Sequence, residues 1–242
     1  MTAETVSLTG HGGDEIEAYL GRPTDIDGVG GVVVIHHLPG YDEGTREITR
    51  RLADHGYLAV CPNLYSRDAP GQPPEEAAAL VRSRGGIPDE RLVGDVAGAA
   101  ATLRALPASN GKVAVIGFCS GGRHAFLAAC SLPLDAAVDC YGAFVIEPPP
   151  EGSPLKVTPV VDRAGNLSCP LLGLFGAEDQ HPSPEETAEL ARVLDGLGKS
   201  HKFHTFPDAG HAFFAVDRPN YRPEAAKQGW ALIWEFFGRH LT

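Results

Sequence analysis

The chain has 242 residues, of which 43% are hydrophobic and 21% are charged, a composition typical of a folded globular protein. Its 31 acidic residues outnumber its 20 basic residues, and the formal net charge of −11 at pH 7 argues against binding to nucleic acid or to anionic membrane surfaces. The length is usual for one α/β domain, so we expect residues 1–242 to form a single domain.

Extended and helical patterns alternate along the chain. The expected strands are short apolar or β-branched runs: Thr5–Leu8, Ile16–Leu20, Gly31–His36, Leu58–Cys61, Val113–Ile116, Ala136–Tyr141, Leu171–Phe175 and Lys202–Phe206. Apolar residues at helical spacing predict helices over Leu92–Leu106, after Ser183 and after Pro223. Strands separated by helices indicate a mostly parallel twisted sheet with helices on both faces. Two segments rich in proline and glycine, Ser66–Pro74 and Glu147–Pro159, are expected to be loops that border a site.

Targeting and redox features favour a cytoplasmic protein. The apolar run Val32–Ile35 is far shorter than the roughly 20 residues that cross a bilayer, and residues 1–10 do not resemble a secretion signal. The five cysteines are odd in number, widely spaced and without a C-x-x-C pair, which is typical of neither a disulfide framework nor a zinc site. We therefore expect a reducing compartment, and no metal or other cofactor.

The most informative segment is 113–124, in which a strand pattern leads through G-x-C-x-G at 117–121 into a helical pattern. This is the thiol form of the G-x-S-x-G nucleophile elbow, a sharp turn that needs glycine where side chains would collide with neighbouring backbone. The turn directs the thiol of Cys119 toward the positive end of a helix, which favours thiolate, and prepares the Ser120 N–H to stabilise an oxyanion. The alternative is a buried cysteine at a glycine-rich turn. The Ser120 hydroxyl is a rival nucleophile, but it lies off centre between the glycines.

A cysteine nucleophile that attacks an ester needs a histidine base and a carboxylate that orients the base. In α/β-hydrolases the acid and then the histidine follow later strands. Here Asp179 follows the second-to-last predicted strand and His211, in a Gly-His loop, follows the last. The adjacent Glu178 remains an alternative acid. We expect His124, in the helix after the elbow, to point away from the nucleophile.

With these residues identified, the chain resembles the dienelactone hydrolase family of α/β-hydrolases over nearly its whole length. The motifs that carry the resemblance are His36–Gly40 (HHLPG), Cys61–Tyr65 (CPNLY), Gly117–Gly122 (GFCSGG), Gly176–Asp179 (GAED) and Ala209–Phe213 (AGHAF). The resemblance implies an α/β-hydrolase fold and a Cys-His-Asp triad that falls on Cys119, His211 and Asp179. It also implies a second oxyanion donor, the N–H of Leu38.

Two positions depart from the best-known members of that family. These carry a glutamate in the loop after the third strand, where this chain has His37, which we expect near Cys119. They also carry an arginine shortly after the catalytic histidine that binds the substrate carboxylate. The matching position here is Ala215, with Arg218 a few residues further on. The departures leave the hydrolase class intact and weaken the case for a dienelactone substrate.

Further candidates for substrate contact come from the same resemblance. A second family arginine falls in the segment 73–86, where Arg82 or Arg84 could serve. Tyr65 is a candidate pocket residue, with a buried structural tyrosine as the equal alternative. Phe213 follows the Gly-His motif. We therefore expect substrate contacts from His37, Tyr65, Arg82 and Phe213.

Together these residues predict a cysteine-dependent hydrolase of small lactones or esters that works through a thioester acyl-enzyme, as a monomer or homodimer. One alternative is a general carboxylesterase or thioesterase with the same triad. Another is a degenerate hydrolase scaffold that binds a ligand or a partner without catalysis.

Overall fold

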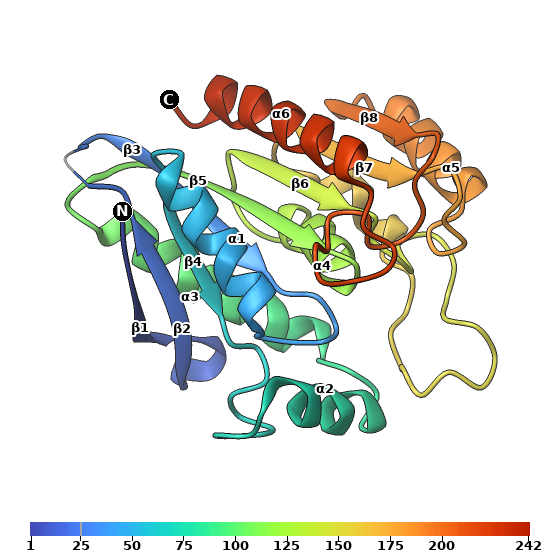
Figure 1. Ribbon diagram of the computed structural model, residues 1–242. Helices are drawn as coiled ribbons and strands as arrows, with labels where there is room; N and C mark the ends of the chain where they lie inside the picture. The colour runs from blue at the N-terminus through green and yellow to red at the C-terminus, as the bar shows by residue number, and fades with distance from the viewer. Residues whose placement is uncertain (25) are drawn as a thin grey trace.

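The computed structural model describes residues 1–24 and 26–242, and its strands form one sheet in the order β1-β2-β4-β3-β5-β6-β7-β8 (Figure 1). The strands are β1 (Thr2–Thr9), β2 (Glu15–Arg22), β3 (Val29–Ile35), β4 (Leu58–Pro62), β5 (Ser109–Phe118), β6 (Ala136–Cys140), β7 (Leu171–Gly176) and β8 (His201–Phe206). β1 pairs with β2, and β2 with β4, in antiparallel fashion, whereas the other pairs are parallel. The mostly parallel sheet is therefore confirmed, and every predicted strand is present.

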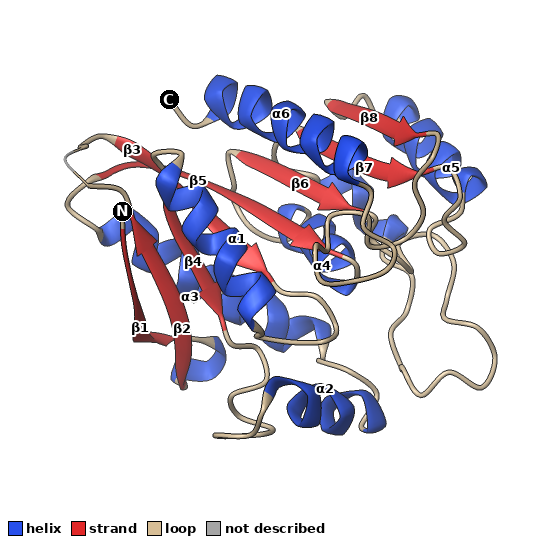
Figure 2. Ribbon diagram, viewed as in Figure 1, coloured by secondary structure: helices blue, strands red, loops and turns tan. Residues whose placement is uncertain are grey.

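Helices cover both faces of the sheet (Figure 2). They are α1 (Glu43–Asp54), α2 (Pro74–Ser83), α3 (Asp89–Ala105), α4 (Ser120–Ala129), α5 (Pro184–Gly196) and α6 (Pro223–His240), with short 3-10 turns at His11–Gly13 and Val161–Asn166. α1 and α6 lie on one face, and α3 and α4 on the other (Figure 1). The predicted starts of α5 and α6 are confirmed, and the Ser183 hydroxyl caps α5 by accepting from the Glu186 N–H. α1 and α2 have no counterpart among the predicted helices.

The central strand β3 shows why a continuous apolar run is buried on both sides. Val33 and Ile35 belong to the core that includes α3 and α4, whereas Val32 and Val34 belong to the core that includes α1 and α6. Successive side chains of a strand point to opposite faces, so each face receives alternate residues. Each fully buried side chain of this size contributes roughly 1.5–3 kcal/mol of burial free energy.

The carboxyl ends of the parallel strands point toward one edge of the sheet, where the connecting loops gather. The loops after β3, β4, β5, β7 and β8 carry the sequence motifs described above, and the loop after β6 contains the segment 147–159. The segment 147–159 contains no helix or strand, as expected, whereas the end of the segment 66–74 begins α2. None of the described helices is both long enough and apolar enough to span a bilayer.

Candidate active site

Cys119 occupies a sharp turn between the end of β5 and the first residue of α4. Its backbone has φ 56° and ψ −122°, a conformation that non-glycine residues rarely adopt. The Cys119 N–H donates to the Cys140 carbonyl at 3.0 Å, which fixes the turn to the end of β6. A Cβ on Gly117 would lie 1.8 Å from the Gly121 carbonyl oxygen, and a Cβ on Gly121 would lie 2.3 Å from the Ile35 carbonyl oxygen. Both glycines are therefore required by the backbones that approach them.

The ring of His211 lies close to both Asp179 and Cys119. Its Nδ1 lies 2.9 Å from Oδ2 of Asp179, and Cys119 lines the same cleft as the ring and raises the pKa of the imidazole. Asp179 is buried, and its Oδ1 also accepts from the His181 N–H at 2.9 Å. Glu178, the alternative acid, is exposed and makes no contact with the His211 ring among the described hydrogen bonds. The structure thus brings Cys119, His211 and Asp179 together at one cleft.

The surroundings of His211 favour its protonated form. Burial alone would lower the pKa of the imidazole, but the hydrogen bonds and negative charges of Asp179 and Cys119 outweigh burial and raise that pKa to about 10. The imidazolium form of His211 is therefore favoured near neutral pH, and a positive charge beside a thiol is the arrangement that activated cysteines use.

The two expected oxyanion donors come from the residue after Cys119 and from the loop after β3. Ser120 is the first residue of α4, where the N–H groups of a helix lack partners inside the helix. Leu38 lies in the loop after β3 and lines both cavities that contain Cys119. The carbonyl of Leu38 accepts from the Tyr65 hydroxyl at 3.0 Å, so the candidate pocket residue Tyr65 holds this loop.

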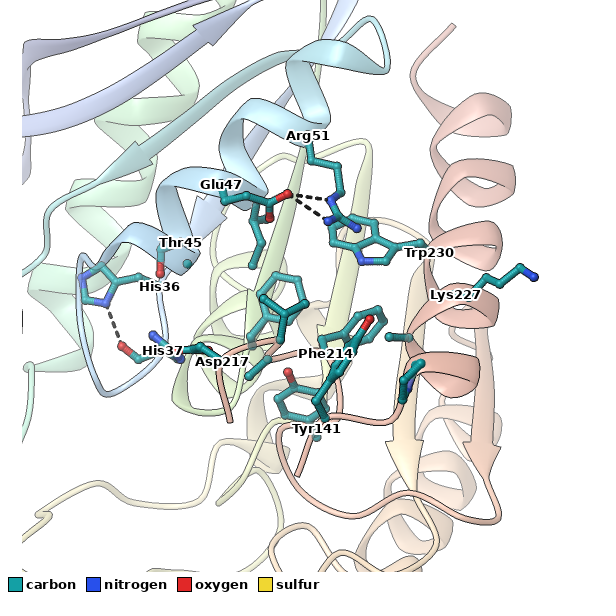
Figure 3. Close-up of a pocket in the computed structure, with 18 of the residues that line it drawn as sticks. His36, His37, Thr45, Glu47, Arg51, Tyr141, Phe214, Asp217, Lys227 and Trp230 are labelled. Atoms are coloured by element: carbon teal, nitrogen blue, oxygen red, sulfur yellow. Dashed lines mark hydrogen bonds and ion pairs between the residues drawn. The ribbon is translucent and has the colours of Figure 1, made fainter. Parts of the chain in front are cut away.

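The peptide before Leu38 is held by its carbonyl. The His37 carbonyl is 2.9 Å from Nδ1 of His36 (Figure 3) and accepts from the Gly40 N–H at 2.9 Å. Because Nε2 of His36 accepts from the Leu64 N–H at 3.3 Å, the ring proton belongs on Nδ1. The C=O and N–H of a trans peptide point in opposite directions, so the bonds to the His37 carbonyl also fix the direction of the Leu38 N–H.

Cys119 borders two cavities. An open cleft of about 570 Å³ is also lined by His211, Asp179, Asn220 and Arg222. Cys119 also lines a smaller cavity of about 60 Å³, together with Leu38, Tyr65 and Phe144. Residues from the predicted loop 147–159 line both cavities, as expected for a loop that borders a site.

His124 lines the smaller cavity together with Cys119, so the expectation that it points away from the nucleophile is wrong. It follows Ser120 by four residues on α4, and residues at this spacing share one face of a helix. The i, i+4 spacing from the start of the helix was the signal available in the sequence. His124 is buried, and burial keeps its pKa well below the ordinary value.

Residues 16–241 match the model of the dienelactone hydrolase family. The chain belongs to this family. A proposed carboxymethylenebutenolidase of Salmonella typhimurium is 34% identical over 238 residues, covering 94% of this chain and 84% of that one. Carboxymethylenebutenolidase 1 of Cupriavidus pinatubonensis is 32% identical over 229 residues, covering 91% and 90%. The crystal structure of a proposed dienelactone hydrolase from Klebsiella pneumoniae matches with a TM-score of 0.86 and 31% identity over 99% of both chains, which confirms the α/β-hydrolase fold.

The residues expected to bind substrate by resemblance to the dienelactone hydrolases lie in different places. Tyr65 lines the smaller cavity beside Cys119, although its side chain is buried. His37 turns to Asp42, with Nε2 and Oδ2 2.6 Å apart, and lines a separate cavity that does not include Cys119. Phe213 is fully buried in the aromatic core. Arg82 is exposed on α2 and lines neither of the two cavities that contain Cys119.

The structure also identifies an arginine that the motifs did not suggest. Arg222 lines the open cleft with His211 and forms no ion pair among the described residues. It directly precedes α6 and lies eleven positions after His211, so it belongs to no short motif. Arg123 lines the smaller cavity, but its guanidinium is paired with Asp89 at 2.8 Å. Across residues 1–24 and 26–242, no group of His, Cys, Asp and Glu could hold a metal ion.

Proposed function

We propose that this member of the dienelactone hydrolase family hydrolyses a carboxylic ester or lactone, with Cys119 as the nucleophile and a thioester acyl-enzyme as the intermediate. The observation that carries the proposal is that Cys119, His211 and Asp179 line one cleft, with the His211 ring bound to Asp179. The names of the relatives, carboxymethylenebutenolidases, support an ester or lactone bond as the target.

In the first half of the reaction, the thiolate of Cys119 attacks the carbonyl carbon. The resulting oxyanion accepts hydrogen bonds from the N–H groups of Ser120 and Leu38, and each such donor contributes roughly 3–4 kcal/mol in comparable sites. The C–O bond then breaks, and the leaving alkoxide takes the proton from Nε2 of His211. The Nδ1–H of His211 donates to Asp179 throughout, which keeps the ring in the correct tautomer.

In the second half, neutral His211 removes a proton from water, and the hydroxide attacks the thioester. The second oxyanion uses the same two donors, and its collapse breaks the C–S bond. The carboxylic acid product leaves, and the thiolate–imidazolium pair is restored. A lactone follows the same steps, except that the alcohol formed first stays attached to the acyl group.

A single-turnover experiment with p-nitrophenyl acetate tests the nucleophile. We expect wild-type protein, quenched in acid during turnover, to carry one acetyl group on the peptide that contains Cys119. Cys119→Ala should lose this adduct and lower kcat/KM by about a thousandfold or more. Cys169→Ala, at a buried cysteine outside the cavities, is the matched control and should retain both. Full activity of Cys119→Ala, or acetyl on another residue, would refute the proposal.

The same experiment addresses the alternative of a scaffold without catalysis, because such a protein would form no acyl adduct at all. The general carboxylesterase alternative uses the same chemistry and differs only in substrate range. A comparison of p-nitrophenyl esters with a carboxylate-bearing lactone separates it from a dienelactone hydrolase.

A further inference from the structure

A cavity of about 410 Å³ lies beside the candidate active site, between α1 and α6 (Figure 3). Its floor lies over the carboxyl ends of the central strands, since His36 follows β3, Phe118 ends β5 and Tyr141 follows β6. Open α/β sheets bind ligands at this edge, and small-molecule sites have volumes of roughly 300–1,000 Å³. The place and the size of this cavity are therefore those of a ligand site. It shares no lining residue with the two cavities around Cys119.

Six aromatic side chains contribute to the wall of this α1–α6 cavity: Phe118, Tyr141, Phe214, Tyr221, Trp230 and Trp234. The rings of Phe214 and Trp230 meet edge to face, with centroids 5.5 Å apart, and Trp230 stacks on Trp234 at 4.9 Å. Figure 3 shows Phe214, Trp230 and Tyr141 around the same space. Aromatic walls in these orientations favour a further ring, which can add offset-stacked or edge contacts.

The charged groups at the upper rim neutralise each other. The Arg51 guanidinium lies 2.9 Å from a carboxylate oxygen of Glu47, as the dashed lines in Figure 3 mark. It also lies over the Trp230 ring, 5.0 Å from the ring centroid. This pair offers the occupant of the cavity a flat guanidinium–indole surface without an uncompensated charge.

The remaining charged groups of the lining are paired or turned away. His37 is bound to Asp42, and Asp217 lies 3.5 Å from Arg218. Lys227 extends from α6 away from the cavity (Figure 3). Transfer of an ion into this apolar space would lose hydration without gaining a partner, which is costly. The lining therefore favours a neutral occupant.

We propose that the α1–α6 cavity binds a neutral aromatic ring, carried either by the ester substrate or by a separate small molecule. An occupant would contact residues next to each part of the candidate active site. The Tyr141 ring meets the His211 ring edge to face at 5.2 Å, Phe118 precedes Cys119, and His37 precedes Leu38. Binding does not depend on the proposed function, whereas an effect on hydrolysis rests on it.

Tryptophan fluorescence provides a direct test. The chain has two tryptophans, Trp230 and Trp234, and both line the α1–α6 cavity, so the intrinsic signal comes only from its wall. We expect nitrobenzene, a neutral ring and a contact quencher, to quench this fluorescence in a saturable way. 4-Nitrobenzoate has the same ring with a negative charge and should bind at least about tenfold more weakly. Linear quenching without saturation, or equal affinity for the two compounds, would overturn the proposal.

A variant that fills the cavity locates the bound ring. Ala231 lines the cavity from α6 and is otherwise exposed, so Ala231→Leu should fold normally and raise the Kd for nitrobenzene about tenfold. Ala101→Leu, at an exposed position of α3 outside the cavity, is the matched control and should leave the Kd unchanged. An unchanged Kd in Ala231→Leu would contradict binding at this place.

Kinetics then distinguish the two sources of the ring. If the ring belongs to the substrate, nitrobenzene should raise the KM for p-nitrophenyl acetate without changing kcat, and Ala231→Leu should raise the same KM. If a separate molecule binds there, nitrobenzene should change kcat instead. The fluorescence assay measures binding without catalysis. Inactivity of the enzyme would therefore refute the proposed function, whereas the Kd values alone would decide whether the cavity binds the ring.

Discussion

The charge state of the His211 imidazole is determined by its burial and by its neighbours Asp179 and Cys119. A histidine at this depth would ordinarily lose its proton, because burial penalises the imidazolium. Asp179 on one side and Cys119 on the other reverse that preference and raise the pKa to about 10. In the proposed reaction, the ring therefore carries a proton that the leaving group can take.

This raised pKa predicts a pH dependence of stability. The ordinary pKa is 6.5 and the folded value is about 10, so the protonated ring stabilises the fold fully below pH 6.5. That contribution is lost as the pH rises through 10. We expect the difference in unfolding free energy between wild type and His211→Gln to be largest at pH 6 and to shrink steadily up to pH 10.5, as measured in urea. A difference that stays constant over this range would contradict the assignment.

His36 is a second histidine whose surroundings set its charge, in the opposite direction. Burial is the largest effect and lowers its pKa to about 4, so the neutral ring donates through Nδ1 to the His37 carbonyl. We expect His36→Leu to release that carbonyl, misdirect the Leu38 N–H and slow acylation by p-nitrophenyl acetate by roughly 10- to 100-fold. The pre-steady-state burst measures this rate.

Two comparisons show whether His36→Leu slows acylation by misdirecting the Leu38 N–H or by disturbing the site in general. The amide of His36→Asn can donate from nearly the position of Nδ1 and should recover most of the acylation rate. Alkylation of Cys119 by iodoacetamide forms no oxyanion, so its rate should be the same in wild type and His36→Leu. Equal losses in acylation and alkylation would indicate a disturbed nucleophile instead.

Arg222 is an exposed cation in the cleft of a protein whose net charge is −11. We expect Arg222→Ala to raise KM for an ester that carries a carboxylate by roughly 2- to 10-fold, because the substrate loses a charge-assisted contact. KM for neutral p-nitrophenyl acetate should not change. Arg82→Ala, at an arginine outside the cleft, should have no effect on either substrate. Equal changes for the charged and neutral esters would show that Arg222 does not recognise charge.

At the scale of elements, the connection from β5 to α4 determines the position of Cys119. The end of the strand is buried on both faces and the helix begins immediately after Cys119, so the connection between them is the single residue Cys119. Close backbone approach replaces side-chain packing at this point, which is why the turn needs glycine on both sides of the cysteine. The rigidity of this turn then aims the thiol at the loops that follow β7 and β8.

The steric crowding at this turn predicts opposite effects for two glycine substitutions. Gly117→Ala places a Cβ 1.8 Å from a backbone oxygen, so we expect it to lower the unfolding free energy by about 3 kcal/mol or more and to abolish esterase activity. Gly196→Ala, at the end of α5, meets nothing within 4 Å and should raise stability by about 0.5–1 kcal/mol. Chemical denaturation of both variants checks the pair, and a neutral Gly117→Ala would contradict the steric account.

At the scale of the whole molecule, the parallel order of the sheet gathers residues that are distant in the chain. β3, β5, β6, β7 and β8 all end at one edge, so the loops that carry Leu38, Cys119, Asp179 and His211 meet there. The ends of β3, β5 and β6 also form the floor of the α1–α6 cavity, which lies next to these loops. The site is therefore a property of the strand order as much as of the individual motifs.

The sequence by itself determined the strands, the turn at Cys119 and the order of the candidate triad. These features depend on local rules, since β-branched runs, turn sterics and helix caps act between residues close in the chain. Only the tertiary structure decided where side chains point. It placed His124 beside the nucleophile, His37 against Asp42, Phe213 in the core and Arg222 in the cleft, because these directions depend on packing between segments that are far apart in the sequence.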